Sequence, residues 1–339
     1  MRHTGARFSQ VPLDLPGDSW PLRVINYFRR GYRQPSPRRY PSCVEAYARE
    51  RRYPWHPEAS SVSAETRTGK GMGLRMGNHA DVPVVILAGG LGTRITEESA
   101  HRPKPMIEIG GQPILSHIMK YYASWGFRRF VICAGYKSQA IKEYFVNYAW
   151  SAGDVEVVTK TGEVKRIGHH PDDWHVSVID TGAETMTGGR LRRIRTLLPA
   201  TSPFCMTYGD GLSDVNLDAL MDMHRRGGKL ATVTAVTPPG RFGALILGGD
   251  GQSVESFEEK PRGDGAFING GFFILERDAL DQIDGDATSW EREPMERLVR
   301  MGQLQAYRHE GFWQPMDTLR DKNYLEERWA SGRAPWKRW

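Results

Sequence analysis

The sequence predicts an α/β protein with a doubly wound, Rossmann-like fold built on a mixed, largely parallel sheet. Two observations predict this class: short apolar runs recur along the chain, and segments with a helical period of apolar residues alternate with them. Apolar runs of this kind are typical of strands buried on both faces. The order strand, helix, strand then implies right-handed crossovers, with helices on both faces of the sheet.

The predicted elements start at about Val82. Pro83 to Ala88 is an apolar run that ends in two glycines, and we expect the first buried strand there. Residues 112–125 place apolar side chains on one helical face, after which Gly126 should end the helix. That face consists of Ile114, Leu115, Ile118, Met119 and Tyr122. Further strands are expected at 130–134, 176–180, 204–210 and 231–236, and further helices at 138–148, 190–198 and 216–226.

The composition excludes several classes of protein. Of the 339 residues, 39% are hydrophobic and 25% are charged, which is typical of globular domains and not of a chain disordered throughout. No apolar run approaches the roughly 20 residues of a membrane span, and the N-terminus lacks an apolar signal segment. We therefore expect a cytoplasmic protein with no membrane partner. The cysteines have no metal-binding spacing, and we interpret them as reduced core thiols: Cys43, Cys133 and Cys205.

The excess positive charge lies entirely in the N-terminal segment. The chain has a formal net charge of +6, but its first 75 residues hold 14 Lys and Arg against six Asp and Glu, and the rest hold 32 against 34. The segment is rich in Arg, Pro and Ser and has no sustained apolar period. A basic arm is one hypothesis, and upstream sequence translated from a misplaced start before Met72 or Met76 is another. Because no nucleic-acid-binding motif is present, we favour a disordered extension over residues 1–80 and one folded domain over residues 81–339, with no nucleic-acid partner.

A glycine-rich segment directly follows the first strand. Glycines at the density of GGLGTR (Gly89–Arg94) let backbone N–H groups approach a phosphate chain, although an ordinary turn explains the loop taken alone. The Gly-Lys-Ser/Thr of a P-loop and the third glycine of a dinucleotide fingerprint are both missing. Arg94 ends the loop, and Lys104 lies between Pro103 and Pro105, which fix the backbone on both sides. These two cations favour a phosphate-binding site.

Two acidic residues are candidates for a metal site. Asp210 lies between two glycines at the end of the strand 204–210. Ligands of parallel sheets bind at the carboxyl ends of strands, so Asp210 should face the glycine loop, although an Asp that only stabilises a turn is the alternative. Mg²⁺ on a triphosphate requires oxygen ligands, and one carboxylate is seldom enough. Asp317, which follows Trp313 and Pro315 in a stiff aromatic segment, is the second candidate.

Together these motifs resemble the sugar-1-phosphate nucleotidylyltransferase family. The order LAGGLGTR, PKPM, TYGDG and EEKP carries the resemblance, which covers about residues 82–339. Within the family, the glucose-1-phosphate cytidylyltransferase branch is the most similar, on the segments AGYKSQAIKEYF, DTGAETMTGGRL, PPGRFGAL, EEKPRGDGAFINGGFF, GFWQPMDTLRDK and APWK. The GGDG turn at 248–251 is longer than usual, and we expect a hairpin tip there. The resemblance implies a GT-A-like nucleotidyltransferase fold and makes residues 81–339 the catalytic domain.

The resemblance also implies a set of site residues. The nucleotide side would consist of Leu87, Ala88, Gly89, Gly90, Leu91, Gly92, Thr93, Arg94, Lys104, Thr185, Arg190 and Gly209. The sugar-phosphate side would consist of Glu259, Lys260, Asn269 and Gly270. Mg²⁺ would be held by Asp210 and Asp317, and the catalytic residues would be Arg94, Lys104 and Asp210. A surface ion pair is the alternative for Glu259 and Lys260, and core packing is the alternative to a ligand contact for Trp313.

The implied reaction joins CTP and α-D-glucose 1-phosphate to give CDP-glucose and pyrophosphate. An oxygen of the sugar phosphate would attack the α-phosphorus of CTP in line, and because this nucleophile is already an anion no general base is needed. Catalysis would then consist of alignment and of charge neutralisation by Mg²⁺, Arg94 and Lys104. The family resemblance further implies a homo-oligomer, and CDP-glucose would feed the sugars of bacterial surface polysaccharide such as O antigen.

Two other functional hypotheses stay open. The base could be thymine or uracil, from dTTP or UTP, because base choice depends on a few hydrogen bonds that a sequence pattern does not weigh. The chain could also be a catalytically silent sugar-nucleotide-binding subunit that regulates a partner. That hypothesis predicts losses at the charged positions, whereas Arg94, Lys104, Asp210, Lys260 and Asp317 are all present.

Overall fold

The computed structural model describes residues 79–90, 92, 95, 102–151, 153–168, 172–238, 244–247, 253–258 and 267–339. The chain divides into two units, 1–63 and 64–339, and all described residues belong to the second. Several predictions fall outside the described residues, namely those on the extension before residue 79, on Cys43, Leu91, Thr93, Arg94, Glu259 and Lys260, and on the turn at 248–251.

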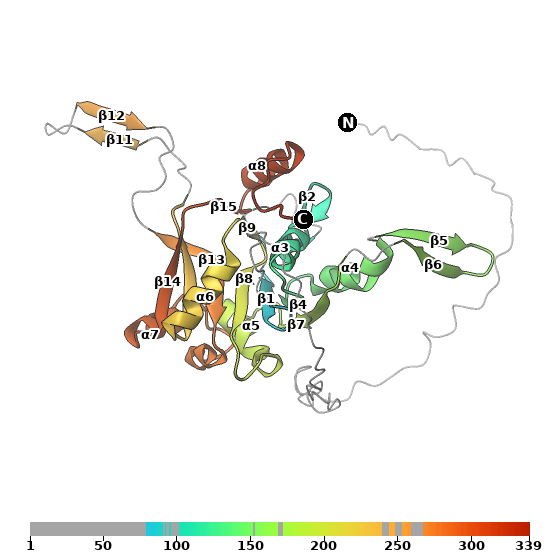
Figure 1. The fold of residues 1–339 in the computed structure, drawn as a ribbon, viewed down its shortest axis with the longest axis horizontal. Coiled ribbons are helices and arrows are strands. Elements are labelled where there is room, and N and C mark those ends of the chain that lie inside the picture. Colours follow the sequence, from blue (N-terminus) through green and yellow to red (C-terminus); the bar gives the residue numbers. More distant parts are fainter. Residues whose placement is uncertain are drawn as a thin grey trace, which may run out of the picture. The chain divides into compact units, whose positions relative to one another are not determined.

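A seven-stranded sheet in the order β14-β10-β13-β8-β1-β4-β7 forms the centre of the second unit (Figure 1). Its strands are β1 (Pro83–Ala88), β4 (Arg129–Ala134), β7 (His175–Asp180), β8 (Phe204–Tyr208), β10 (Ala231–Val236), β13 (Ile268–Leu275) and β14 (Leu304–His309). Strand β13 is antiparallel to both of its neighbours, and the other neighbouring pairs are parallel. The predicted doubly wound, mixed and largely parallel sheet is therefore confirmed.

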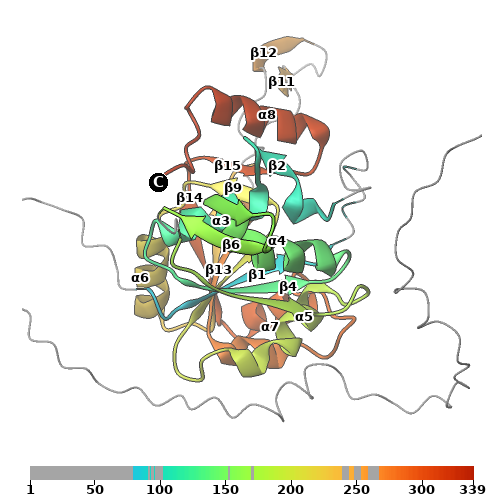
Figure 2. The ribbon, with the colours of Figure 1, turned by 90° about the vertical axis from the view of Figure 1, so that its right-hand side faces the viewer.

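Each face of the sheet has its own hydrophobic core, because successive side chains of a strand point to opposite faces. In β1, Val84 and Ile86 belong to one core, and Val85 and Leu87 belong to the other. The first core is covered by α3 (Ile114–Ala123), α4 (Ser138–Ser151), α6 (Leu217–Gly227) and α8 (Leu319–Ala330). The second is covered by α5 (Thr187–Arg193) and α7 (Glu293–Arg300). Figure 2 shows α3 and α4 on one side of the sheet and α5 and α7 on the other.

The apolar face predicted for the helix after residue 112 is the buried face of α3. All five of its predicted residues are buried, and Gly126 follows the helix with a φ of 93°. The helix is shorter than predicted because Gln112 and Pro113 form the short strand β3 (Gln112–Pro113), which pairs with β2 (Glu108–Ile109). At α6, the Asn216 side chain accepts from the backbone N–H of Ala219 at 2.9 Å and caps the helix.

The helix predicted at 190–198 is wrong in its bounds. Helix α5 begins earlier, at Thr187, and a separate 3₁₀ turn covers Arg195–Leu197. Two glycines in the first turn of α5 lie against the backbone of the loop that precedes α7. A Cβ at Gly189 would lie 2.5 Å from the carbonyl oxygen of Asp286, so glycine is required by a tertiary contact that the local sequence does not reveal.

Small elements complete the described part of the chain. Two-stranded pairs are formed by β5 (Asp154–Val158) with β6 (Glu163–Ile167), by β9 (Gly211–Ser213) with β15 (Trp313–Pro315), and by β11 (Ala244–Leu247) with β12 (Val254–Glu258). Short 3₁₀ turns cover Lys104–Met106 and Arg277–Gln282. Cys133 and Cys205 are buried and free, as predicted, and burial raises the pKa of both thiols.

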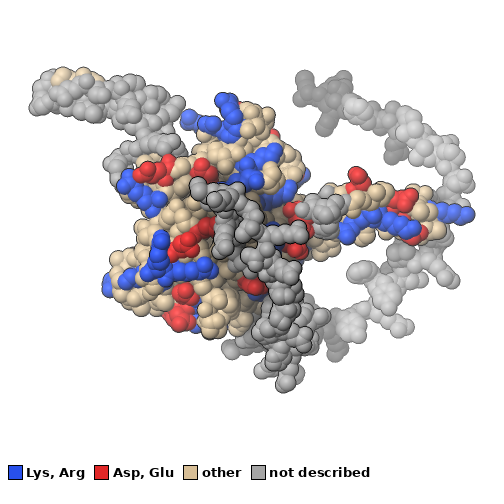
Figure 3. Space-filling model, viewed as in Figure 1, with Lys and Arg blue, Asp and Glu red and all other residues tan. Residues whose placement is uncertain are grey.

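The described surface carries both signs of charge. Figure 3 shows basic and acidic side chains interspersed over the face that it displays. None of the helices in the described ranges is long and apolar enough to cross a membrane.

Candidate active site

A cavity of about 430 Å³ lies at the carboxyl ends of β1 and β8, the edge of the sheet that the sequence indicated. The predicted residues that line it are Leu87–Gly90, Gly92, Lys104, Thr185, Arg190, Gly209, Asp210 and Asp317. The structure thus gathers both candidate metal ligands, Lys104 and the described part of the glycine loop around one space. Pro105, Met186, Thr187 and Tyr208 line it as well.

The ends of β1 and β8 approach each other closely at Gly209. Its backbone N–H donates to the carbonyl oxygen of Leu87 at 2.9 Å. A Cβ at position 209 would lie 3.0 Å from that oxygen and 3.1 Å from Cγ of Pro105, which is tighter than ordinary side-chain contacts. Glycine at this position therefore leaves space for the end of β1 and for Pro105 to pack beside the cavity.

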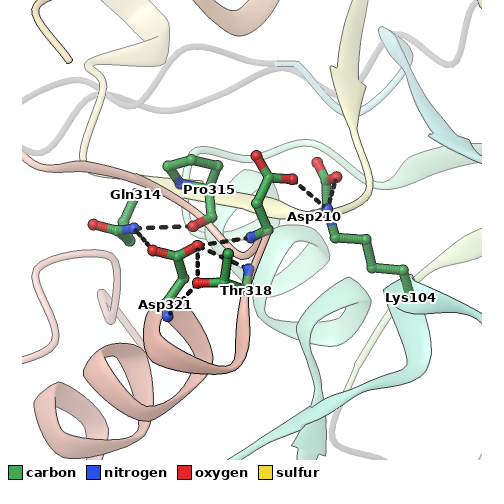
Figure 4. A network of polar contacts seen from close by, with 7 residues as sticks. Lys104, Asp210, Gln314, Pro315, Thr318 and Asp321 are labelled. Atoms are coloured by element: carbon green, nitrogen blue, oxygen red, sulfur yellow. Dashed lines mark hydrogen bonds and ion pairs between the residues drawn. The ribbon is translucent and has the colours of Figure 1, made fainter. Parts of the chain in front are cut away.

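Lys104 lies between the two candidate metal ligands. Its ammonium donates to Oδ2 of Asp210 and to Oδ1 of Asp317, each at 2.7 Å (Figure 4). Burial by itself would lower the pKa of Lys104, but the charge of Asp210 and the hydrogen bonds to both carboxylates outweigh it, and the pKa is raised. The amine is therefore fully charged at neutral pH.

The backbone around Lys104 is fixed by its neighbours. Pro103 precedes a single 3₁₀ turn, in which the N–H of Met106 donates to the carbonyl of Pro103 at 2.8 Å. Pro105 and Met106 are buried. The prediction that two prolines present Lys104 from a stiff segment agrees with this turn.

The pairing of β9 with β15 brings Asp317 to Asp210. The N–H of Met316 donates to the carbonyl oxygen of Asp210 at 2.7 Å, one residue before Asp317. Helix α8 begins directly afterwards with a capping box, in which the side chains of Thr318 and Asp321 each bond the other's backbone N–H. Asp321 also accepts from the N–H of Asp317 at 3.1 Å, so the main chain of the second candidate ligand is held at the helix start (Figure 4).

Two carboxylates from separate segments form a set of donors that suits Mg²⁺. In proteins this ion is usually bound by one or two carboxylates together with water and substrate phosphates. No group of three or more His, Cys, Asp or Glu side chains with metal-binding geometry occurs among the described residues. Asp210 and Asp317 fit an ion that arrives with a phosphorylated ligand, and not a closed structural metal site.

Arg190 is held mainly by the main chain. Its buried guanidinium donates to the carbonyl oxygens of Gly89 at 3.0 Å and Gly182 at 2.8 Å, and to the hydroxyl of Thr181 at 2.7 Å. Burial lowers the pKa of Arg190. The side chain lies under Gly89, where a Cβ would collide with it. Arg190 therefore fixes the start of the glycine loop while it lines the cavity.

The predicted residues Asn269 and Gly270 do not line the cavity, but Asn269 bonds to Tyr208, which does. The amide nitrogen of Asn269 donates to the Tyr208 hydroxyl at 3.2 Å, and its oxygen accepts from the N–H of Gly271 at 2.8 Å. At Gly270, a Cβ would lie 2.7 Å from Val236, and the Gly270 carbonyl accepts from the indole N–H of Trp313 at 2.7 Å. Trp313 is half-buried against the core, which agrees with its packing interpretation.

The sequence did not predict Tyr208, Thr187 or Glu291 as residues at or next to the cavity. The Tyr208 hydroxyl and the Thr187 hydroxyl each donate to one oxygen of Glu291 at 2.6 Å. Burial, followed by the negative charge of Glu291, raises the pKa of Tyr208. Glu291 lies in a charged stretch before α7, and no local pattern in the sequence distinguishes it from a solvated surface acid. Hydrogen bonds therefore run from Asn269 through Tyr208 and Glu291 to Thr187, and of these residues Tyr208 and Thr187 line the cavity.

Known proteins resemble this chain over about three quarters of its length. The nucleotidyl transferase family model matches residues 83–318. A glucose-1-phosphate cytidylyltransferase of Salmonella typhi is 53% identical over 255 residues, which cover 75% of this chain and 98% of that protein. A probable glucose-1-phosphate cytidylyltransferase of Bacillus subtilis is 40% identical over 256 residues, or 75% of this chain and 99% of that protein.

Solved structures support the fold. HddC from Yersinia pseudotuberculosis matches with a TM-score of 0.55 and 24% identity, over 73% of this chain and 99% of its own. A UDP-glucose pyrophosphorylase complexed with UDP-glucose matches with a TM-score of 0.52 and 15% identity, over 74% of this chain and 99% of its own. At these identities the likeness concerns the architecture of the sheet and its helices.

Proposed function

The chain belongs to the nucleotidyl transferase family, and we propose that it transfers the cytidylyl group of CTP to α-D-glucose 1-phosphate, giving CDP-glucose and pyrophosphate. The observation that carries this proposal is the convergence of Lys104, Asp210 and Asp317 on a cavity that is also lined by Gly89, Gly90 and Gly92 of the glycine loop. The Salmonella typhi and Bacillus subtilis relatives, matched over nearly their whole length, support CTP and glucose 1-phosphate as the substrates.

The nucleotide side of the proposed site is the glycine loop with its supports. Backbone N–H groups of residues 89–92 would bind the triphosphate, and the glycines leave them accessible. Arg190 holds this loop through the carbonyl of Gly89. Lys104, and by family resemblance Arg94, would neutralise the charge that develops on the α-phosphate and on pyrophosphate. Thr185, a buried residue of the cavity wall, completes this side.

The reaction requires alignment more than proton transfer. A phosphate oxygen of glucose 1-phosphate attacks the α-phosphorus of CTP, and the bond from that phosphorus to the pyrophosphate oxygen breaks. The nucleophile is already anionic, so no side chain must remove a proton. Asp210 and Asp317 would hold Mg²⁺, which when bound supplies further neutralisation of phosphate charge.

The sugar phosphate would lie on the side of Asn269 and Gly270. Asn269 is oriented by its bonds to Tyr208 and Gly271, which leaves its position well defined for a sugar hydroxyl. Glu259 and Lys260, which match the family's EEKP motif, would bind the hexose and its phosphate. The family resemblance also supports a cytoplasmic homo-oligomer whose product supplies surface polysaccharide such as O antigen.

A pyrophosphate-release assay tests the proposal. Purified protein is given each of four nucleoside triphosphates together with each of several hexose 1-phosphates, with Mg²⁺ and with a chelator. We expect CTP with glucose 1-phosphate to be the best pair and the chelator to abolish turnover. A preference for dTTP or UTP would overturn the choice of base and leave the reaction class intact. No release with any pair would favour a silent, sugar-nucleotide-binding subunit.

A further inference from the structure

Lys104 occupies the point at which the two candidate metal ligands converge. Its Nζ lies 2.7 Å from one oxygen of Asp210 and 2.7 Å from one oxygen of Asp317. The Lys104 side chain is only 12% exposed, so water screens these ion pairs weakly. Both carboxylates therefore share the Lys104 ammonium as a counterion.

A divalent ion bound by the same two oxygens would need nearly the same place. Mg²⁺ lies about 2.0–2.1 Å from its oxygen ligands, so oxygens that it bridges are about 4 Å apart at most. Two oxygens that each lie 2.7 Å from one nitrogen are also close together, at 5.4 Å or less. An ammonium and a divalent ion at these same two oxygens would repel each other at short range, so each would weaken the binding of the other.

We propose that Lys104 competes with the divalent metal for Asp210 and Asp317, so that the metal binds tightly only when a triphosphate gives the ammonium another anionic partner. The proposal rests on the proposed function, because the triphosphate is the partner. Lys104 lines the same cavity as the glycine loop, so its flexible side chain needs no backbone change to turn from the carboxylates to a phosphate. Lys104 is then a positioning residue for the metal as well as a phosphate ligand.

The test measures metal binding without turnover. Mn²⁺ serves as the probe, and its free concentration is followed by electron paramagnetic resonance with the full chain and no nucleotide. Lys104→Met should bind Mn²⁺ at least about tenfold more tightly than the wild type, which corresponds to about 1.4 kcal/mol. Lys142→Met is the matched control, because Lys142 also pairs with an aspartate, Asp180 at 3.6 Å, but outside the cavity. It should leave Mn²⁺ affinity unchanged.

Further measurements separate the possible outcomes. Adding Asp317→Asn to Lys104→Met should abolish the gain, because the metal then loses a ligand. Mg²⁺ should raise the melting temperature of Lys104→Met and leave that of the wild type unchanged. Equal Mn²⁺ affinity of wild type and Lys104→Met would overturn the proposal. So would tight, nucleotide-independent Mn²⁺ binding by the wild type, a result that does not depend on whether the variant folds. Failure of the proposed function would appear separately, in the pyrophosphate assay.

Discussion

The buried imidazole of His117 should make the folded state sensitive to mild acid. His117 lies in α3 with no exposed surface. Its Nε2 is 2.7 Å from the carbonyl oxygen of Ile109, and its Nδ1 accepts from the indole N–H of Trp336 at 3.3 Å. A carbonyl can only accept, so the neutral ring carries its proton on Nε2. A second proton on Nδ1 would face the Trp336 donor and break that bond.

The magnitude follows from the displaced pKa. Burial lowers the pKa of His117 from 6.5 to about 4. The unfolded chain therefore takes up the proton first, and stability is lost as the pH falls from about 6.5 to about 4, with no further loss from this group below that. At 1.36 kcal/mol for each pH unit, the free energy of unfolding should fall by about 3 kcal/mol over this range.

Urea unfolding between pH 7.5 and pH 4 measures this loss. The substitution His117→Gln removes the titration, so the variant should be less stable than the wild type at pH 7.5 but should lose about 3 kcal/mol less on acidification. The exposed residue His175 provides the matched control, His175→Gln, which should keep the steep dependence of the wild type. Parallel curves for His117→Gln and the wild type would refute a buried neutral imidazole.

Four further predictions concern the site. Asp317→Asn should lower kcat at least about 100-fold while the urea midpoint stays nearly constant, since Lys104 keeps its ion pair with Asp210; near-normal kcat would remove Asp317 from the metal site. Gly209→Ala should push against the Leu87 carbonyl, lowering unfolding free energy by about 1–3 kcal/mol, and an unchanged melting curve would contradict this. Glu291→Gln should raise KM for glucose 1-phosphate more than KM for CTP, and the reverse order would place it on the nucleotide side. Lys260→Ala should also raise KM for glucose 1-phosphate more than KM for CTP, and a larger effect on KM for CTP would place Lys260 on the nucleotide side.

The parts of the fold that follow from local pattern were predictable from the sequence. The run Pro83–Ala88 is apolar at every position because β1 is buried on both faces, and its predicted bounds agree with the structure. The antiparallel strand β13 was not predicted, because its direction depends on pairing with β8 and β10 across long stretches of chain. The predicted bounds of helix α5 were wrong for a related reason. Its first turn contains glycines because Gly189 packs against the backbone of Asp286, which is distant in the sequence.

The residues of the candidate site likewise divide into those with a local signal in the sequence and those without one. Lys104 could be predicted because the prolines that fix its backbone are its immediate neighbours in the sequence. Asp317 could be nominated from its stiff surroundings, but only the β9–β15 pairing explains why it meets Asp210. Glu291 had no local signal at all: its significance depends on two hydroxyl donors, Tyr208 and Thr187, that precede it by 83 and 104 positions. Hydrogen bonds from residues so far away in the sequence can be found only in the three-dimensional structure. Acidic residues that are positioned in this way, such as Glu291, are therefore the part of a site that is hardest to predict from the sequence.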